Sequence, residues 1–130
     1  MHELGVMLKV IGQIEEMARE ESFSHVTGIV LDIGELSTIL PFFIKEYFPL
    51  MIEDKPLFKG CELTIEETEG IGRCKECGQM YRIIETDGHC PVCNSFRKDV
   101  LSGRDFIIKE IQIPAEEEDP FPEQVDDLAS

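Results

Sequence analysis

Two groups of residues in this 130-residue chain have the types and spacing that bind metal ions. The first is the start of the chain, Met1-His2-Glu3, where an α-amino group lies one residue from an imidazole. The second is a pair of C-x-x-C motifs within residues 74–93. Because nitrogen donors and thiolates favour different ions and geometries, the sequence predicts two metal sites of different chemistry.

Four of the five cysteines form the C-x-x-C motifs, and Cys61 stands apart. In a chain without a secretory signal, such pairs favour metal ligands over disulfides. Each C-x-x-C turn points two thiolates at a shared ion, and four thiolates leave no position open for water. We therefore expect a structural zinc site, with iron in a rubredoxin-like site as the alternative. The predicted ligands are Cys74, Cys77, Cys90 and Cys93.

The N-terminus offers a compact nitrogen chelate. The α-amine of Met1, the amide nitrogen of His2 and its Nδ1 can close adjacent rings around Ni(II) or Cu(II), ions that favour square-planar nitrogen sites. The fourth donor must be the amide or carboxylate of Glu3, water or a partner protein. Such incomplete coordination suits metal transfer better than storage. The alternative is that Met-His occurs here by chance or as an expression scar.

Composition restricts the class of protein. The net charge is −15, and residues 114–130 contain seven acids, three prolines and no Lys or Arg, which predicts an acidic disordered tail. The remaining chain is still acidic, so we expect no binding to nucleic acid. Apolar runs stay well below the roughly 18 residues of a membrane span, and no signal peptide precedes the first helix. We expect a cytoplasmic protein that makes no membrane contact.

The elements that must position these sites follow from the apolar periodicity. Leu4, Met7, Ile11, Ile14 and Ala18 recur at three- and four-residue steps, which predicts an amphipathic helix that begins near residue 3. Three stretches that are rich in apolar and β-branched residues predict strands. These strands cover residues 26–33, 62–68 and 106–113, with Leu63 and Ile65 on one face of the second.

A second helix is predicted after the first strand. Ser37 or Thr38 is the expected N-cap, and Pro41 falls in or near the first turn, where proline is tolerated. Pro49 should end or kink this helix. The expected buried stripe is Leu40, Phe43, Tyr47 and Leu50 or Met51.

The cysteine segment interrupts two strands that are otherwise consecutive, so we expect the flanking strands to pair in the main sheet while the insertion forms a separate lobe. The predicted fold class is α+β: a small mixed sheet of about three strands packed with two helices, with an inserted zinc-ribbon lobe. Relative motion of the two lobes is expected. The predicted domains are a nickel-binding α/β domain (1–69 with 104–113), a zinc-binding domain (70–103) and the tail (114–130).

Several motifs together resemble the HypA family of hydrogenase nickel-incorporation proteins. The resemblance is carried by their order and spacing from residue 1 to about residue 113. The motifs are Met1-His2-Glu3-Leu4, Ile33-Gly34-Glu35-Leu36, Gly60-Cys61-Glu62-Leu63, the two C-x-x-C pairs and Gly103-Arg104-Asp105. Gly5 departs from the family, which often has Ser there, and the acidic tail is not part of the common pattern.

The resemblance implies that His2 is the essential nickel ligand, with the Met1 amine and the backbone around Glu3 completing the site, and that the four paired cysteines hold zinc. It also implies action with the nickel-handling GTPase HypB to load nickel into the large subunit of [NiFe]-hydrogenase, and in some organisms a role in urease maturation. The family catalyses no reaction, and no His-Glu cluster in the sequence suggests a hydrolase. The alternative function is a zinc-ribbon module that binds protein or nucleic acid, and a homodimer stays open.

Four other residues have less specific expectations. His25 is expected at the surface or as a capping group. His89 precedes Cys90 and is either a solvated turn residue or a group that tunes the zinc site. Cys61 is expected to be a small core residue, and Glu35 could help to order the N-terminus, although no sequence feature requires it.

Overall fold

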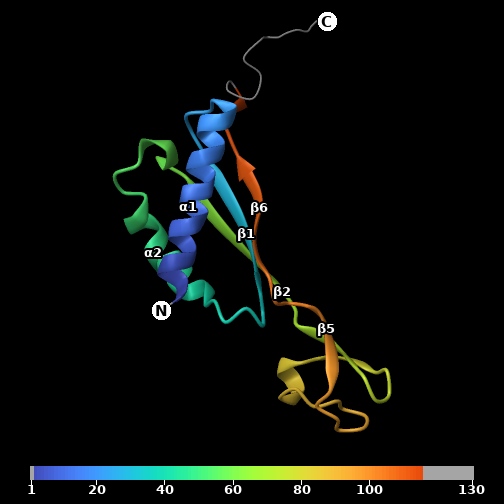
Figure 1. The fold of residues 1–130 in the computed structure, drawn as a ribbon. Helices are drawn as coiled ribbons and strands as arrows, with labels where there is room; N and C mark the ends of the chain where they lie inside the picture. The colour runs from blue at the N-terminus through green and yellow to red at the C-terminus, as the bar shows by residue number, and fades with distance from the viewer. Residues whose placement is uncertain (1, 116–130) are drawn as a thin grey trace, which may run out of the picture. The chain divides into compact units, whose positions relative to one another are not determined.

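The computed structural model describes residues 2–115, so Met1 and all but the first two residues of the predicted tail lie outside the described part (Figure 1). The element order is the predicted one: helix, strand, helix, strand, cysteine module and strand. The elements are α1 (His2–Glu21), β1 (Gly28–Gly34), α2 (Pro41–Met51), the 3-10 turn η1 (Pro56–Phe58), β2 (Glu62–Thr68), β3 (Ile71–Cys74), β4 (Met80–Arg82), the 3-10 turn η2 (Ile84–Thr86), β5 (Lys98–Ser102) and β6 (Phe106–Gln112).

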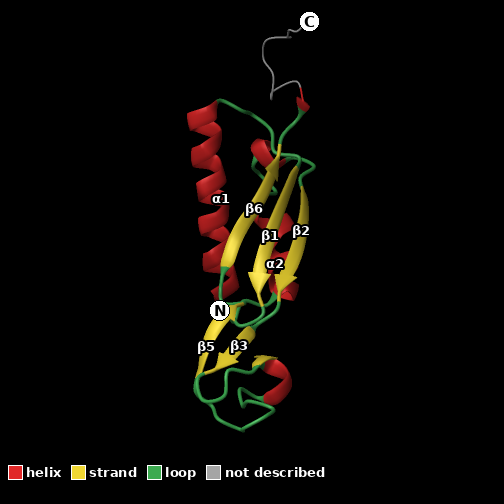
Figure 2. Ribbon diagram, turned by 90° about the vertical axis from the view of Figure 1, so that its right-hand side faces the viewer, coloured by secondary structure: helices red, strands yellow, loops and turns green. Residues whose placement is uncertain are grey.

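The main sheet has three strands in the order β2-β1-β6 (Figure 2). At the start of β1, Thr27 accepts from the backbone N–H of Glu62 and donates to Gln112. At its end, the Glu35 N–H donates to Thr68 and the Gly34 N–H to Asp105. These bonds make β2 parallel and β6 antiparallel to β1. The sheet is mixed, as predicted. The two strands that flank the cysteine insertion both belong to it, but they do not pair with each other, because β1 lies between them.

The chain forms two compact units. Of the described residues, the first unit contains 2–30, 40–64 and 108–115, and the second contains Leu31–Ile39 and Ile65–Ile107. In the first unit α1 and α2 pack together and cover the same face of the strands (Figures 1 and 2). Its core consists of fully buried apolar side chains: Met7, Ile14, Val26, Ile29, Ile44 and Phe58.

Helix α1 confirms the predicted apolar stripe except at its start. Met7, Ile11, Ile14 and Ala18 are buried, whereas the side chain of Leu4 is 44% exposed. Glu3 occupies the buried face instead, with 5% of its surface exposed. The stripe therefore begins with a carboxylate one turn before Met7.

Helix α2 begins later than predicted and buries a different stripe. Its N-cap is Leu40, which makes no side-chain cap, and Pro41 is its first residue. Thr38 adopts a left-handed backbone with φ 66°, so neither it nor Ser37 caps the helix. Ile44 and Phe48 are buried. Of the predicted stripe, Phe43, Tyr47 and Met51 are half-buried, while Leu40 and Leu50 are 52% and 68% exposed. Of the two expected effects of Pro49, an end of the helix at this residue is ruled out, because the helix continues through Pro49 to Met51.

The cysteine lobe contains a second sheet with the order β4-β3-β5. Both neighbours of β3 run antiparallel to it, with Gly72 opposite Tyr81 in β4 and Arg73 opposite Asp99 in β5. The small core of this lobe is Cys74, Tyr81 and Cys90, with Ile83 packed against it. The predicted α+β fold with two helices, a mixed sheet and an inserted cysteine lobe is thus confirmed. Among the described helices, none is long and apolar enough to cross a membrane.

Candidate metal centres

The two C-x-x-C turns share one backbone geometry. In the first, the Gly78 N–H donates to the carbonyl of Cys74; in the second, the Asn94 N–H donates to that of Cys90. Gly78 and Asn94 both have a left-handed backbone, with φ 82° and 66°, a conformation that glycine and asparagine tolerate best. The sequence therefore encodes the same tight turn twice, once with each of these residues. In both turns the first cysteine, Cys74 or Cys90, is buried and the second is exposed.

The four sulfur atoms converge on one point. All lie within 4.8 Å of one another, and the closest pairs, Cys74 with Cys93 and Cys77 with Cys90, are 3.5 Å apart. A tetrahedron with Zn–S distances of about 2.3 Å has sulfur atoms about 3.8 Å apart. The cluster therefore needs only small shifts to enclose a zinc ion, and its donor set fits zinc.

Backbone N–H groups point at the two buried sulfurs. Glu76 donates to Cys74 Sγ over 3.3 Å, and Val92 donates to Cys90 Sγ over 3.4 Å. In the cluster without an ion, the N–H of Cys77 and that of Glu76 outweigh burial and lower the pKa of Cys74 to about 6. Burial also opposes ionisation of Cys90, but backbone donors outweigh it and lower its pKa.

The exposed sulfurs behave in the opposite way. The Ser95 N–H favours the Cys93 thiolate, but the hydrogen bond with Cys74, aided by burial, raises the pKa of Cys93 to about 12. For Cys77 the Gln79 N–H lowers the pKa, yet the hydrogen bond with Cys90 and burial together raise it. In each close sulfur pair the pKa of one cysteine is lowered and that of the other is raised, so an arriving ion must displace the protons of Cys77 and Cys93.

The structure describes the N-terminal site only in part. Met1 and the side chain of His2 lie outside the described part, whereas the backbone of His2 begins α1. Glu3 Oε2 accepts a hydrogen bond from the backbone N–H of Leu40 over 3.0 Å. Its carboxylate therefore interacts with the start of α2 within the same compact unit. Sequence reasoning missed this contact with Leu40.

The remaining histidines and Cys61 have distinct environments. His25 is exposed, as expected, and its Nδ1 lies 3.4 Å from Ser24 Oγ. His89 is not a freely solvated residue: its ring packs edge-on against Phe96 with centroids 5.2 Å apart, and its Nδ1 is buried without a hydrogen bond. Cys61 is half-buried, so it is only partly the core residue expected.

Glu35 lies in the second unit, where its carboxylate contacts Arg82 and Gly70. Among the described residues, these are the contacts that the structure gives for its side chain. Arg82 had no sequence signal as a structural residue. Its partner lies 47 positions away, so no local pattern connects the two.

Comparison with known proteins assigns the family. The family model described as "Hydrogenase/urease nickel incorporation, metallochaperone, hypA" matches residues 1–113. Two curated relatives, both called hydrogenase maturation factor HypA, come from Chlorobaculum parvum and Crocosphaera subtropica. Each is 39% identical over 113 residues, which cover 87% of this chain and 99% or 96% of the relative.

Solved structures agree in fold. The solution structure of the Ni metallochaperone HypA from Helicobacter pylori matches with a TM-score of 0.62 and 23% identity, and covers 88% of this chain and 98% of that one. A second structure, "Solution structure of HypA protein", matches with a TM-score of 0.65 and 25% identity over 89% of this chain and 98% of that one. The sequence match over residues 1–113, together with this fold and the four-cysteine cluster, shows that the chain belongs to the HypA family of hydrogenase/urease nickel-incorporation metallochaperones.

Proposed function

We propose that this protein binds Ni(II) at its N-terminus and delivers it to [NiFe]-hydrogenase during maturation. The ligands are His2, the amine of Met1 and the backbone around Glu3. The observation that carries this proposal is the match to a nickel-incorporation family from residue 1 onward, which includes all three residues. Backbone nitrogens in a first helical turn have no acceptor within the helix, which is compatible with their use as metal donors.

The second metal in this proposal is zinc, bound by Cys74, Cys77, Cys90 and Cys93. Its role is structural, because four thiolates fill a tetrahedral site and the lobe around them has a small core that needs a metal to fold. We assign the nickel function to residues 1–69 with 104–113, the zinc function to 70–103, and no metal to the tail at 114–130. These functional boundaries differ from those of the compact units, which place residues 31–39 with the cysteine lobe.

Family membership implies contact with the hydrogenase maturation machinery. We propose that the partners are the nickel-handling GTPase HypB and the large subunit of [NiFe]-hydrogenase, with urease maturation proteins as a second destination. The protein acts in the cytoplasm and catalyses no reaction itself. A homodimer stays open as its assembly state.

The alternative of a nucleic-acid-binding zinc ribbon is not favoured. The lobe has few cations, and three of them pair with acids: Arg97 with Glu76 at 2.6 Å, Lys75 with Asp99 at 3.7 Å, and Arg82 with several carboxylates. Phosphate binding depends on cations that are available to neutralise the backbone. A nearly neutral lobe on an acidic chain is a poor electrostatic match for a polyanion.

The experiment that tests the proposal is a metal count followed by nickel titration of protein with its native start. We expect one zinc per chain and one exchangeable Ni(II). His2→Ala should abolish the nickel site while zinc content and circular dichroism stay unchanged. Blocking the α-amine by acetylation should weaken nickel binding as well, because it removes a donor.

The matched control is His25→Ala, which removes an exposed imidazole elsewhere in the chain. It should titrate with nickel as the wild type does. If His2→Ala binds nickel with wild-type affinity, the N-terminal assignment is wrong. If His25→Ala loses binding instead, the imidazole donor has been misplaced.

A further inference from the structure

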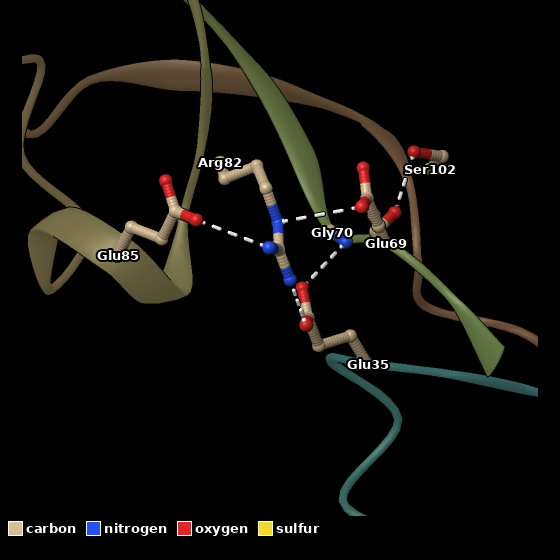
Figure 3. A network of polar contacts seen from close by, with 6 residues as sticks. All are labelled: Glu35, Glu69, Gly70, Arg82, Glu85 and Ser102. Carbon is tan, nitrogen blue, oxygen red and sulfur yellow. Dashed lines mark hydrogen bonds and ion pairs between the residues drawn. The ribbon is translucent and has the colours of Figure 1, made fainter.

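Arg82 lies at the centre of a network of three carboxylates (Figure 3). Its Nη1 donates to Glu85 over 3.0 Å, its Nη2 donates to Glu35, and its Nε lies 3.9 Å from Glu69. Glu35 is the least exposed of the four side chains, at 19%. Burial opposes the charge of Arg82, but Glu35 and Glu69 outweigh it and raise the pKa of the guanidinium. Arg82 therefore stays charged.

Glu35 connects this network to the segment that follows β1. Its second oxygen accepts from the Gly70 N–H over 2.9 Å, where the chain enters the cysteine lobe (Figure 3). The next residue, Leu36, donates its N–H to Gly103, where the chain leaves the lobe, over 2.7 Å. The short segment of Glu35 and Leu36 thus bonds to the chain both where it enters the cysteine lobe, at Gly70, and where it leaves it, at Gly103. We call these two points the crossings.

The crossings are packed backbone to backbone. A Cβ added to Gly34 would lie 2.2 Å from the carbonyl oxygen of Gly103, and Gly103 itself has φ +97°. Close contact of this kind, with hydrogen bonds from Gly34 and Leu36, leaves little freedom for a hinge at this point. Within the second unit, residues 34–36 and the two crossings thus form a tightly bonded junction.

The same strand that presents Arg82 also contributes to the cysteine cluster. Neighbouring residues of a strand point to opposite sides. Tyr81 is buried with Cys74 and Cys90, and its hydroxyl donates to the carbonyl of Gly88 over 3.3 Å. Strand β4 has three residues and lies at the edge of its sheet, where it pairs only with β3. We therefore expect its order to depend on the cluster that it packs against.

We propose that Arg82 and Glu35 make the order of residues 34–36 depend on zinc. With the ion bound, β4 is fixed, and Arg82 and Glu35 hold the segment against Gly70 and Gly103. When the ion is removed, the cluster no longer orders β4, the ion pair separates and the segment becomes mobile. Arg82 and Glu35 are positioning residues in this scheme, which rests on the zinc assignment proposed above.

The test is hydrogen exchange on the full chain, read at the backbone N–H groups of Glu35, Leu36 and Gly70, with zinc content measured on every sample. In the wild type, removal of zinc by a chelator should speed exchange at these sites by about tenfold or more. Arg82→Leu should retain one zinc per chain and yet show similarly fast exchange at these sites. Removing its zinc should then add little.

Two variants serve as controls. Arg97→Leu breaks a comparable ion pair in the same unit, Arg97 with Glu76 at 2.6 Å, without touching the junction, so its exchange should match that of the wild type. Glu35→Gln retains an acceptor for Gly70 but loses the charge, and it should exchange as fast as Arg82→Leu. If Arg82→Leu also loses protection from exchange in α1, that variant has unfolded, and Glu35→Gln then serves as the test instead.

Each result is decisive. Wild-type protection in zinc-bound Arg82→Leu and Glu35→Gln would overturn the proposal, as would protection that survives zinc removal in the wild type. A chain that holds no zinc would refute the zinc assignment itself, which the metal measurement reveals independently of exchange. In that case both proposals fail, whereas a bound zinc with unchanged exchange defeats only this one.

Discussion

The carboxylate of Glu3 and the backbone N–H of Leu40 form a hydrogen bond of 3.0 Å at the start of both helices. Glu3 is 5% exposed and Leu40 is 52% exposed, so this bond is partly shielded from water. A carboxylate in such a position is stabilised by the donor it faces and by the N-terminal dipole of the helix. The contact links the first turn of α1 to the start of α2.

Replacing Glu3 separates its acceptor role from its charge. Glu3→Leu leaves the Leu40 N–H without its acceptor and should lower the free energy of unfolding by about 1–3 kcal/mol. Glu3→Gln retains an acceptor of the same length and should cost less than about 1 kcal/mol. Urea denaturation followed by circular dichroism measures both. As a control, Glu20→Gln changes an exposed acid of the same helix and should stay within about 0.5 kcal/mol. Equal losses for Gln and Leu would show that the charge matters more than the bond.

The position of Glu3 in the sequence fits its burial. Glu3 lies four residues before Met7, on the same periodic stripe as Ile11, Ile14 and Ala18, but a carboxylate is expected in water. For α2 the pattern itself was ambiguous, because apolar side chains surround the helix, and several residue triplets fit a period of 3.6. Only the packing of α2 against its neighbours decides that Ile44 and Phe48 are inside.

The corrected α2 stripe gives a second prediction. Ile44→Ala removes a fully buried side chain and should lower the free energy of unfolding by about 2–5 kcal/mol. Leu50→Ala truncates a side chain that is 68% exposed in the same helix, and it should change stability by about 0.5 kcal/mol or less. Chemical denaturation of the two variants compares them directly. A larger loss for Leu50→Ala would restore the stripe predicted from sequence.

Zinc binding should release protons, because the pKa values of Cys77 and Cys93 are raised and those of Cys74 and Cys90 are lowered. Near pH 7.5 Cys77 and Cys93 are protonated, because their pKa values lie above 9.0, so at least two protons leave per zinc. Protons compete with the ion, so affinity falls as pH falls, by at least about 100-fold from pH 8 to pH 7.

Competition with a chromophoric chelator of known pH dependence measures this slope, and proton release in weak buffer gives an independent count. An affinity that does not change over this range would mean that all four sulfurs are already thiolates before the ion arrives. The pKa of Cys74 is lowered to about 6. Below this pH zinc must displace the proton of Cys74 as well, so its affinity should fall more steeply.

Cys61 should react slowly with alkylating reagents. Burial, aided by Glu62, raises the pKa of its thiol to about 11, and only the thiolate attacks. At pH 8 its alkylation should be about 100-fold slower than that of an unperturbed thiol with a pKa of 9.0. The rate should rise about tenfold per pH unit up to pH 10. Mass spectrometry of iodoacetamide-treated zinc protein measures it, with the guanidinium-unfolded chain as reference. Equal rates in the two states would contradict the raised pKa.

The cysteine site was more predictable than its surroundings. C-x-x-C spacing is a local property, so the sequence alone indicated which four sulfurs converge. Arg82 and Glu35 are far apart in the chain, and their contact depends on the pairing of β3 with β4 and on the end of β1. No periodicity encodes such a contact, because it results from tertiary structure. The N-terminal ligands stay a prediction, since Met1 and the His2 side chain are outside the described residues.

The unequal burial of the two cysteines in each turn gives the cluster an inner and an outer edge. Cys74 and Cys90 are shielded by the lobe, whereas Cys77 and Cys93 face solvent. A chelator, an oxidant or a competing metal therefore meets Cys77 and Cys93 first. Zinc loss from this protein should begin with the bonds to Cys77 and Cys93. Oxidation should likewise occur at these two sulfurs before it occurs at Cys74 and Cys90.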